Sequence, residues 1–401
     1  METSANVAAM KNSANTALEW VQRVMMRNPD GSEGVWERIR IDLDEIQPWV
    51  RPDCCSEAAM TFFLRSANDP DSIDRKIAVN LLTYVLRRQT LRGGFPFYEW
   101  APRDITQADP DKTCGAQLHW PNDQGKTLEI LATLAPHFPE LPLTEAARKL
   151  GDFFLATQTE AGSWSIDGTD YPGTCFTPWA ACGLSALFAL THEEKYRSAA
   201  VRAIQNLQAN QLPGGRIKTT FEINQMENWR PASSEAAEAL KAFAVANKHL
   251  GIDTSQSAEK CARFLLSLQH ESGAILNCDA SCMEASEQRS DRLTDLVYTD
   301  GYALQALQVA GKVFDRPDWL AAADRLAEFL MAVQCRDENP KWDGAWRGSY
   351  HVDLKQWHGR ADQQNPLDEG GMYSVYTGWS VFPITSGLLI ASGCALPVTN
   401  H

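Results

Sequence analysis

A turn motif that occurs six times along the chain constrains its fold more than any other feature. Each copy is an amphipathic helix with a glutamine near its end, followed by a glycine-rich turn that often carries Trp or Phe. The six glutamines lie roughly 60 residues apart, at Gln22, Gln89, Gln158, Gln211, Gln269 and Gln334. A period of this length indicates stacked repeats, because one such unit cannot bury its apolar face alone.

Each turn is followed by a second helix rich in small and apolar residues, such as TPWAACGLSALFAL at 177–190. Small residues allow close packing and favour an inner ring, whereas the helices before the turns carry more charge and favour a half-solvated outer ring. The sequence has no convincing strand pattern beyond short segments such as 39–43. We therefore predict an all-α fold: one (α/α)6 toroid over residues 1–401, a double ring of six helical hairpins.

The predicted outer helices span 13–27, 73–90, 144–158, 193–209, 255–269 and 317–334. The predicted inner helices span 55–67, 122–135, 177–190, 233–249, 297–312 and 374–392. In the turns, glycine permits a positive φ at the end of the outer helix. We expect the glutamine amide to bond free backbone groups there, and the aromatic residue to pack between hairpins.

Composition excludes several classes of partner and cofactor. The net charge of −14 argues against nucleic acid and against an anionic membrane surface. The apolar stretch 379–398 contains Pro383 and Pro397, so we predict a buried helix there and not a membrane span. No secretory signal opens the sequence, which predicts a cytoplasmic protein unless a signal has been trimmed. No phosphate loop or dinucleotide fingerprint is present, so we expect no nucleotide cofactor.

The ten cysteines have irregular spacing, which predicts buried reduced thiols and not a disulfide framework. Cys278 and Cys282 flank Asp279, but no second ligand pair with zinc-like spacing accompanies them. We therefore predict no metal site.

The turns and the hairpin count resemble known families. The Gln…Gly-x-Trp turns resemble those of terpenoid cyclase and protein prenyltransferase toroids, and six hairpins resemble (α/α)6 glycosidases, polysaccharide lyases and uronyl epimerases. The resemblance covers nearly the whole chain and implies the α/α-toroid fold, whereas fold alone does not define chemistry. Two departures weaken an isoprenoid function. Asp42-Leu43-Asp44-Glu45 lacks the last Asp of the cyclase acid motif, and the segment 298–302 lacks the zinc-binding Cys of prenyltransferases.

In a toroid of this kind, the N-termini of the inner helices line the central pocket. We predict four catalytic carboxylates there, Asp123, Asp300, Glu57 and Glu235. Paired carboxyl groups suit glycoside chemistry, and neighbouring helices would pair Glu57 with Asp123 and Glu235 with Asp300. The aromatic residues beside Asp300 are expected to raise its pKa and suit it to general-acid catalysis. The structural alternative is that these acids cap helices.

Polar and aromatic residues near the same helix starts are predicted to bind substrate. They are His119, Trp120, Asn122, Trp179, Trp229, Arg230, Tyr298, Arg347, Trp357, His358, Arg360, Tyr376 and Trp379. Aromatic rings stack on the apolar faces of sugars, and carboxylates and arginines bond their hydroxyl rims. About half of the tryptophans in this set are expected to be core residues instead.

The mixture of carboxylate, aromatic and arginine side chains favours a saccharide as the substrate. We predict an enzyme that cleaves a glycosidic bond in an oligo- or polysaccharide, by hydrolysis or β-elimination. A lyase or an epimerase would use Tyr or His for proton transfer beside a uronate. A terpenoid-cyclase-like enzyme and a non-catalytic ligand-binding toroid are the competing hypotheses. The sequence leaves the oligomeric state open.

Overall fold

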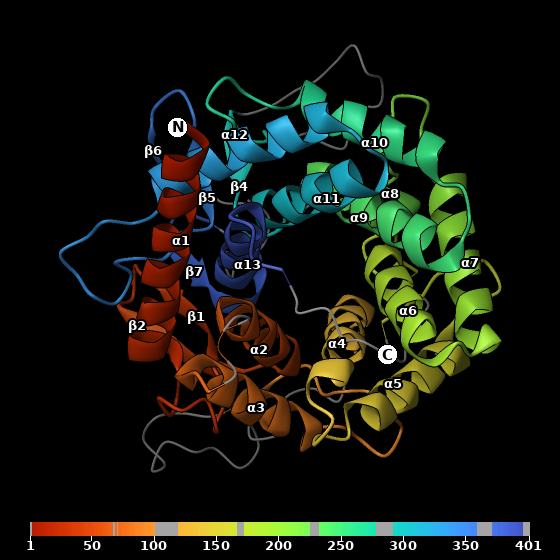
Figure 1. The fold of residues 1–401 in the computed structure, drawn as a ribbon. Coiled ribbons are helices and arrows are strands. Elements are labelled where there is room, and N and C mark those ends of the chain that lie inside the picture. The colour runs from red at the N-terminus through yellow and green to blue at the C-terminus, as the bar shows by residue number, and fades with distance from the viewer. Residues whose placement is uncertain are drawn as a thin grey trace.

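The computed structural model describes residues 2–66, 69, 71–100, 119–166, 172–224, 232–277, 292–358 and 371–395. These residues form two concentric rings of helices around a common axis (Figure 1). The chain alternates between the rings, so each outer helix is followed by an inner one. The α/α-toroid fold predicted from the repeat is therefore confirmed.

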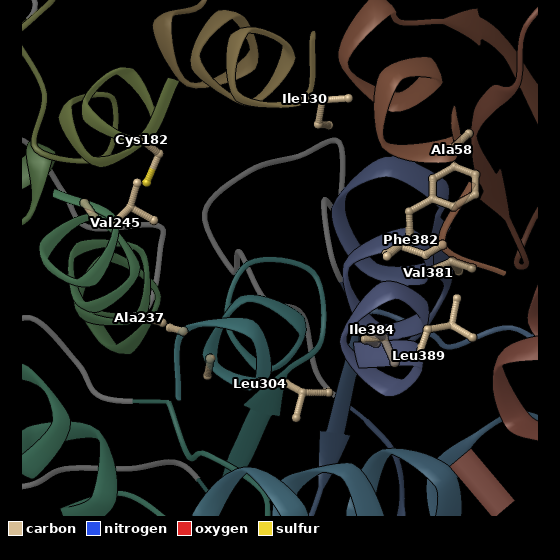
Figure 2. Packing of buried hydrophobic residues seen from close by; sticks show 14 of the residues in the cluster. Ala58, Ile130, Cys182, Ala237, Val245, Leu304, Val381, Phe382, Ile384 and Leu389 are labelled. Carbon is tan, nitrogen blue, oxygen red and sulfur yellow. The ribbon is translucent and has the colours of Figure 1, made fainter. Parts of the chain in front are cut away.

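The inner ring contains the helices with the most small residues. They are α2 (Pro52–Ser66), α4 (Pro121–Leu134), α6 (Thr177–Thr191), α9 (Ala232–Leu250), α11 (Asp300–Val313) and α13 (Phe382–Ala391). Each inner helix packs against the next, and α13 packs against α2, which closes the ring. Figure 2 shows this packing: Phe382 on α13 points toward Ala58 on α2, and Cys182 on α6 points toward Val245 on α9.

The outer ring contains α1 (Glu2–Trp20), α3 (Ile73–Leu86), α5 (Leu143–Thr157), α7 (Glu194–Ala209), α10 (Ser255–Ser267) and α12 (Pro317–Val333). The first outer helix, α1, packs on the last inner helix, α13, so the two ends of the chain share one hairpin-like pair. The predicted helices match these elements closely, except at the first outer and the last inner helix. The helix α1 starts at Glu2, well before the predicted start, and continues into a π-helical turn, η1 (Val21–Met25).

The repeated glutamine joins neighbouring hairpins. In five copies its side-chain amide donates one hydrogen bond to a carbonyl of its own turn and one to a carbonyl of the next outer helix. For Gln334 the second acceptor is Ser13 O on α1, at 3.0 Å, so this contact links the last turn to the first helix. The structural role predicted for the glutamine is confirmed and extends to the neighbouring hairpin.

The turn glycines are required by both conformation and space. Gly93 has a φ of +93°, and a Cβ atom there would lie 2.3 Å from Lys149 O on the next outer helix. The aromatic residue of the turn is anchored to its own outer helix, since Trp164 Nε1 donates to Phe154 O at 3.0 Å. Trp346 Nε1 likewise donates to a carbonyl of α12.

The sixth inner element departs from the predicted helix at 374–392. It begins as a strand, β7 (Ser374–Tyr376), continues as a π-helical turn, η4 (Thr377–Val381), and only then becomes α13. A Cβ atom on Gly378 would lie 2.2 Å from Cys54 Sγ, so the chain passes very close to α2 at this point. This close approach, followed by Pro383, explains the delayed start of the regular helix.

The described residues also form two small antiparallel sheets. One has the order β3 (Glu99–Trp100), β2 (Glu45–Val50), β1 (Trp36–Arg40) and β7, and the other has the order β4 (Leu293–Asp295), β5 (Ser349–His351) and β6 (Gln356–Trp357). Sequence patterns did not predict these sheets, because the strands are short and three of the five pairs, β1–β7, β2–β3 and β4–β5, join strands far apart in the sequence. Two short helical segments, η3 (Ala135–His137) and α8 (Thr220–Ile223), complete the described elements.

Seven cysteines fall within the described residues, and all seven are free. Six of them are buried, in agreement with the reduced thiols expected from the sequence. Within the same part of the chain, no helix is both long and apolar enough to cross a membrane.

Candidate active site

A layer of charged side chains lies on the axis of the ring, near the start of the inner helices. Arg51 is at the centre of this layer. It lies between the end of β2 and Pro52, the first residue of α2. The Arg51 guanidinium donates to Glu37 Oε1 at 2.6 Å and to Asp53 Oδ1 at 3.1 Å, and it lies 2.6 Å from Asp123 Oδ2. One buried cation thus holds carboxylates from β1, α2 and α4 together.

Lys126 is the second buried cation of this layer, and its side chain is only 1% exposed. Its Nζ atom lies 3.1 Å from Glu57 Oε2 and 3.5 Å from Asp53 Oδ2. It also lies 3.0 Å from Tyr302 Oη and 3.6 Å from the centroid of the Trp379 ring. Its neighbours come from α2, α11 and η4, so Lys126 connects three parts of the inner ring.

Burial raises the pKa of Glu57 to about 7, and the neighbouring Asp53 acts in the same direction. The Lys126 ammonium opposes this increase. Desolvation therefore dominates, as is typical for a carboxyl group removed from water. A carboxyl group with this pKa exchanges a proton readily near neutral pH, which is the property required of a general acid or base.

Asp123 follows Pro121 in the first turn of α4, where the helix dipole favours an acid. Burial and the nearby Asp53 raise its pKa, whereas Arg51 lowers it. Its Oδ2 atom contacts Arg51, and its Oδ1 atom has no hydrogen-bond partner among the described residues. Asp123 thus keeps one buried oxygen available for a ligand. Asn122 Oδ1, beside it, is also buried and unpaired there.

Three aromatic side chains surround the Lys126 ammonium. The Tyr302 ring lies 4.8 Å from the Trp179 ring and 5.8 Å from the Trp379 ring. Tyr298 packs edge-on against Trp379 at 5.7 Å. The indole Nε1 of Trp179 is buried and has no hydrogen-bond partner in the described part of the chain. The predicted residues Trp179, Tyr298 and Trp379 therefore do meet at the axis.

A row of five aromatic rings runs along one side of the same end of the barrel. Successive ring centroids are 5.5, 5.5, 5.5 and 6.1 Å apart, in the order Trp49, Tyr98, Phe97, Trp120 and Phe176. The Arg51 guanidinium stacks on Phe97 at 4.5 Å, so the row adjoins the charged layer. Trp120 is the member of this row predicted from the sequence. The predicted Tyr376 belongs instead to the cluster of Trp179, Tyr302 and Trp379, and its ring lies 5.0 Å from the Arg38 guanidinium.

Asp300 does not face the axis, so its predicted role as a general acid is corrected. Its Oδ1 atom accepts a hydrogen bond from Ile275 N at 3.3 Å, in the repeat turn after α10. Its Oδ2 atom lies 2.7 Å from Thr294 Oγ1. That hydroxyl also lies 2.6 Å from Ile275 O, and a hydroxyl has only one hydrogen to donate. A protonated Asp300 satisfies both contacts, and burial raises its pKa accordingly.

Glu235 has the same structural role at the start of α9. Its Oε1 atom accepts from Thr220 N at 3.1 Å, and its Oε2 atom lies 2.6 Å from Thr174 Oγ1. Thr174 Oγ1 is also 2.6 Å from Lys218 O, which repeats the arrangement around Asp300. These two acids connect an inner helix to the loop beside it, so the predicted catalytic pair of Glu235 and Asp300 is not assembled.

Several predicted substrate-binding residues lie away from the axis. His119 Nδ1 is 2.7 Å from Phe95 O, and its ring packs 4.9 Å from Phe153 on the outer helix α5. Trp357 packs on Tyr350 in the β4–β5–β6 sheet, 5.3 Å away. The predicted His358 is exposed, and the predicted Arg347 lies 3.6 Å from Asp337. Their expected place in the pocket is therefore corrected.

Trp229, Arg230, Arg360, Cys278 and Cys282 lie outside the described residues. Among the residues that the structure describes, no group of three or more His, Cys, Asp or Glu side chains could hold a metal ion. Five members of the central layer were not among the predicted catalytic and substrate-binding residues: Glu37, Arg51, Asp53, Lys126 and Tyr302. One signal was present for Lys126, because a lysine in the first two turns of a predicted inner helix lies in the interior of the ring and requires a buried partner.

A cavity of about 320 Å³ adjoins this layer. Glu57, Lys126 and Trp179 line its inner end, and its walls continue along α2, α4, α11 and α13. The Glu57 carboxyl group thus borders an open space, whereas the rest of the interior is close-packed.

Comparison with protein-family models and with curated protein sequences finds no match. Solved structures do share the fold. Cellobiose 2-epimerase from Bacillus thermoamylovorans B4167 aligns with a TM-score of 0.72 and 10% identity, over 98% of this chain and 99% of that one. A D-mannose isomerase aligns with a TM-score of 0.69 and 11% identity, over 96% of each chain.

The GH76 α-mannanase BT2949 of Bacteroides thetaiotaomicron aligns with a TM-score of 0.62 and 11% identity, over 96% of each chain. At these identities the likeness concerns the fold alone. The chain is thus an α/α toroid of six hairpins, the architecture of these carbohydrate-active enzymes.

Proposed function

We propose that the protein is a carbohydrate-processing enzyme that hydrolyses a glycosidic bond at the axis of the ring, with Glu57 as the proton donor. The observation that carries this proposal is the Glu57 carboxyl group itself. It borders the cavity, its pKa is raised to about 7, it lies 3.4 Å from Tyr302 Oη, and it shares the Lys126 ammonium with the buried Asp53. Glycoside hydrolysis requires one protonated and one ionised acid. The Arg51 guanidinium, 2.6 Å from Asp123 Oδ2, favours the ionised form of Asp123, in opposition to burial, which raises the pKa of that acid.

Asp123 is the proposed partner that orients the attacking water. Its unpaired Oδ1 atom can accept a hydrogen bond from water, while Arg51 holds its Oδ2 atom in place. Trp179 lines the cavity beside Glu57 and offers apolar surface to a sugar ring, and its unpaired Nε1 can donate to a hydroxyl. Buried polar atoms without partners are costly, so a ligand that pairs them gains affinity.

β-Elimination has less support in this site. Burial raises the pKa of Tyr302 well above its ordinary range, which makes this phenol a poor base. No histidine is among the described residues that line the cavity. Epimerisation or isomerisation is the second candidate, because a carboxyl group with a pKa near 7 can both remove a proton and return it. Two of the structural neighbours, a cellobiose 2-epimerase and a D-mannose isomerase, carry such names.

One panel of substrates distinguishes these reactions. Purified protein is incubated with neutral and uronic oligosaccharides, and three products are measured: new reducing ends, unsaturated uronides by absorbance, and epimers by NMR. We expect new reducing ends with at least one member. Epimers alone would show that the enzyme is an epimerase or isomerase, the second candidate. Unsaturated uronides would show that it cleaves by β-elimination. The absence of all three products would overturn the proposal in favour of a non-catalytic toroid.

Two glutamine variants then test the residue assignment on the substrate found. Glu57→Gln should reduce kcat by at least about 100-fold, the low end for loss of an acid–base group. Glu235→Gln is the matched control, because it makes the same change in a buried acid that bonds Thr220 N and Thr174. It should retain the specific activity of the folded fraction. Equal losses in the two variants would refute the catalytic role of Glu57.

A further inference from the structure

The cavity beside Glu57 extends toward the end of the barrel where the inner helices terminate. Its floor is formed by the first two turns of α2, α4 and α6, through Glu57, Lys126 and Trp179. From there it continues past later turns of the inner helices to Lys312 and Ala395, which are exposed. The aromatic row at Trp49 and Trp120 belongs to the opposite end, where α4 and α6 begin.

The walls of this cavity are largely apolar. Between floor and rim they are formed by Met60, Leu64, Ile130, Val309 and Ile390. The two charged groups deepest in the wall neutralise each other, since Lys241 Nζ lies 2.8 Å from Glu129 Oε2. A largely apolar cavity of this kind favours an apolar group. The wall also contains polar side chains, but Thr61 and Ser386 donate to carbonyls of their own helices and Gln305 bonds Pro383 O and Ser386. A sugar placed there would therefore lose water from its hydroxyl groups and gain few partners.

The surroundings on the other side of Glu57 are different. Arg51, Asp53 and Asp123 form the charged layer there, and Asp123 Oδ1 has no hydrogen-bond partner among the described residues. These groups suit the hydroxyl rim of a sugar. Glu57 thus lies at the boundary between a polar region and an apolar cavity.

We propose that the substrate is a glycoside with an apolar aglycone, which occupies this cavity while the sugar lies against the charged layer. This inference rests on the hydrolysis proposed above. Glu57 donates its proton to the glycosidic oxygen as the bond between that oxygen and the anomeric carbon breaks. The aglycone leaves as an alcohol, water adds hydroxide to the anomeric carbon, and the proton of that water passes to Asp123. The boundary at Glu57 then coincides with the bond that is cleaved.

Chain-length dependence of binding tests this assignment. The probes are n-alkanols from butanol to octanol and n-alkyl glucosides and mannosides from methyl to octyl, below their micellar concentrations. Calorimetric titration of the full-length protein should give an affinity that increases about fourfold per methylene until the cavity is full. An affinity independent of chain length in the alkanols and in both glycoside series would overturn the proposal.

Variants that fill the cavity locate the binding. Ile130→Trp places an indole in the cavity wall. Val309→Phe adds a smaller side-chain volume, at a half-buried position of the same wall. Either should abolish the dependence on chain length. Leu91→Trp adds the same indole on an exposed site and should leave it unchanged. If all three variants bind octyl probes as the wild type does, the apolar group binds elsewhere and the inference is wrong.

The result also separates this inference from the proposed function. Turnover of simple oligosaccharides without preference for an apolar aglycone would support hydrolysis and refute the aglycone site. Chain-length-dependent binding that Ile130→Trp removes, together with no turnover of any alkyl glycoside, would refute hydrolysis. In that case the cavity would remain a binding site for apolar groups.

Discussion

Lys126 Nζ lies 3.1 Å from Glu57 Oε2, in the middle of the inner ring. Neither side chain is more than 10% exposed, so each charge depends on the other for compensation. Asp53 is a second, more distant partner of the same ammonium, at 3.5 Å. Stability and acid–base behaviour of the site are therefore coupled through this lysine, and the coupling can be measured without knowledge of the substrate.

Replacement of Lys126 by methionine should destabilise the fold by about 3 to 5 kcal/mol, because it leaves buried carboxylates without their cation. Urea denaturation at pH 8, where Glu57 is mainly ionised, measures this loss. The double variant Lys126→Met/Glu57→Gln should be more stable than Lys126→Met alone, since the uncompensated charge is then absent. Additive effects of the two substitutions would show that the pair is not coupled.

Glu57 should make the stability of the protein depend on pH. Its pKa in the folded state is raised from the ordinary 4.5 to about 7, so the folded state binds the proton more tightly than the unfolded state. The contribution of the protonated Glu57 to the free energy of unfolding is complete below about pH 4.5 and is lost as the pH rises through 7. The size of the effect is roughly 3 kcal/mol, at about 1.4 kcal/mol per pKa unit.

The measurement compares the free energy of unfolding of the wild type and of Glu57→Gln from pH 4.5 to 8. Between these limits the wild type should lose about 3 kcal/mol relative to the variant. Parallel curves for the two proteins would mean that the Glu57 pKa is ordinary, and its assignment as a general acid would fail with it.

The repeat was sufficient to predict the rings, because each glutamine turn repeats one local structure with one set of backbone partners. It was not sufficient to assign the acids at the helix starts. Asp123 and Gln124 are adjacent in α4, yet Asp123 contacts Arg51 at the axis and Gln124 accepts from Phe95 N at 2.7 Å beside the repeat turn. Successive side chains of a helix diverge by about 100°. A helix start known only to within ~2 residues therefore cannot distinguish the two directions.

Lys126 was missed for a related reason. A lysine is most often solvated, and its burial here depends on Glu57 and Asp53 from a different helix and on Tyr302 much later in the chain. Such partners meet only through closure of the ring. The short strands were missed for the same reason, since β1 pairs with β7 near the other end of the sequence.

Asp300 should tolerate an amide but not an apolar side chain. In Asp300→Asn, the side-chain oxygen can still accept from Ile275 N and the amide can donate to Thr294 Oγ1, as the protonated acid does. We expect a change in unfolding free energy below about 1 kcal/mol, whereas Asp300→Ala should cost about 2 to 3 kcal/mol through unpaired buried groups. A large loss of stability in the asparagine variant would indicate that the ionised carboxylate is the native form.

The turn glutamines provide the last prediction, which concerns closure of the ring. Gln89 Nε2 donates to Gly93 O and Ala146 O, both at 2.8 Å, and thereby fastens one hairpin to the next. Gln89→Glu keeps the shape of the side chain but replaces this donor by a carboxylate oxygen that faces two carbonyl oxygens. It should therefore cost about 2 to 3 kcal/mol, since both hydrogen bonds are lost and acceptors are left opposed.

Gln22→Glu is the control, because the Gln22 side chain accepts from Arg65 Nη2 at 3.5 Å, and a carboxylate there gains an ion pair. Thermal unfolding should show a lower Tm for Gln89→Glu and a change within about 0.5 kcal/mol for Gln22→Glu. Equal effects at the two positions would mean that the link between hairpins contributes nothing beyond the turn itself.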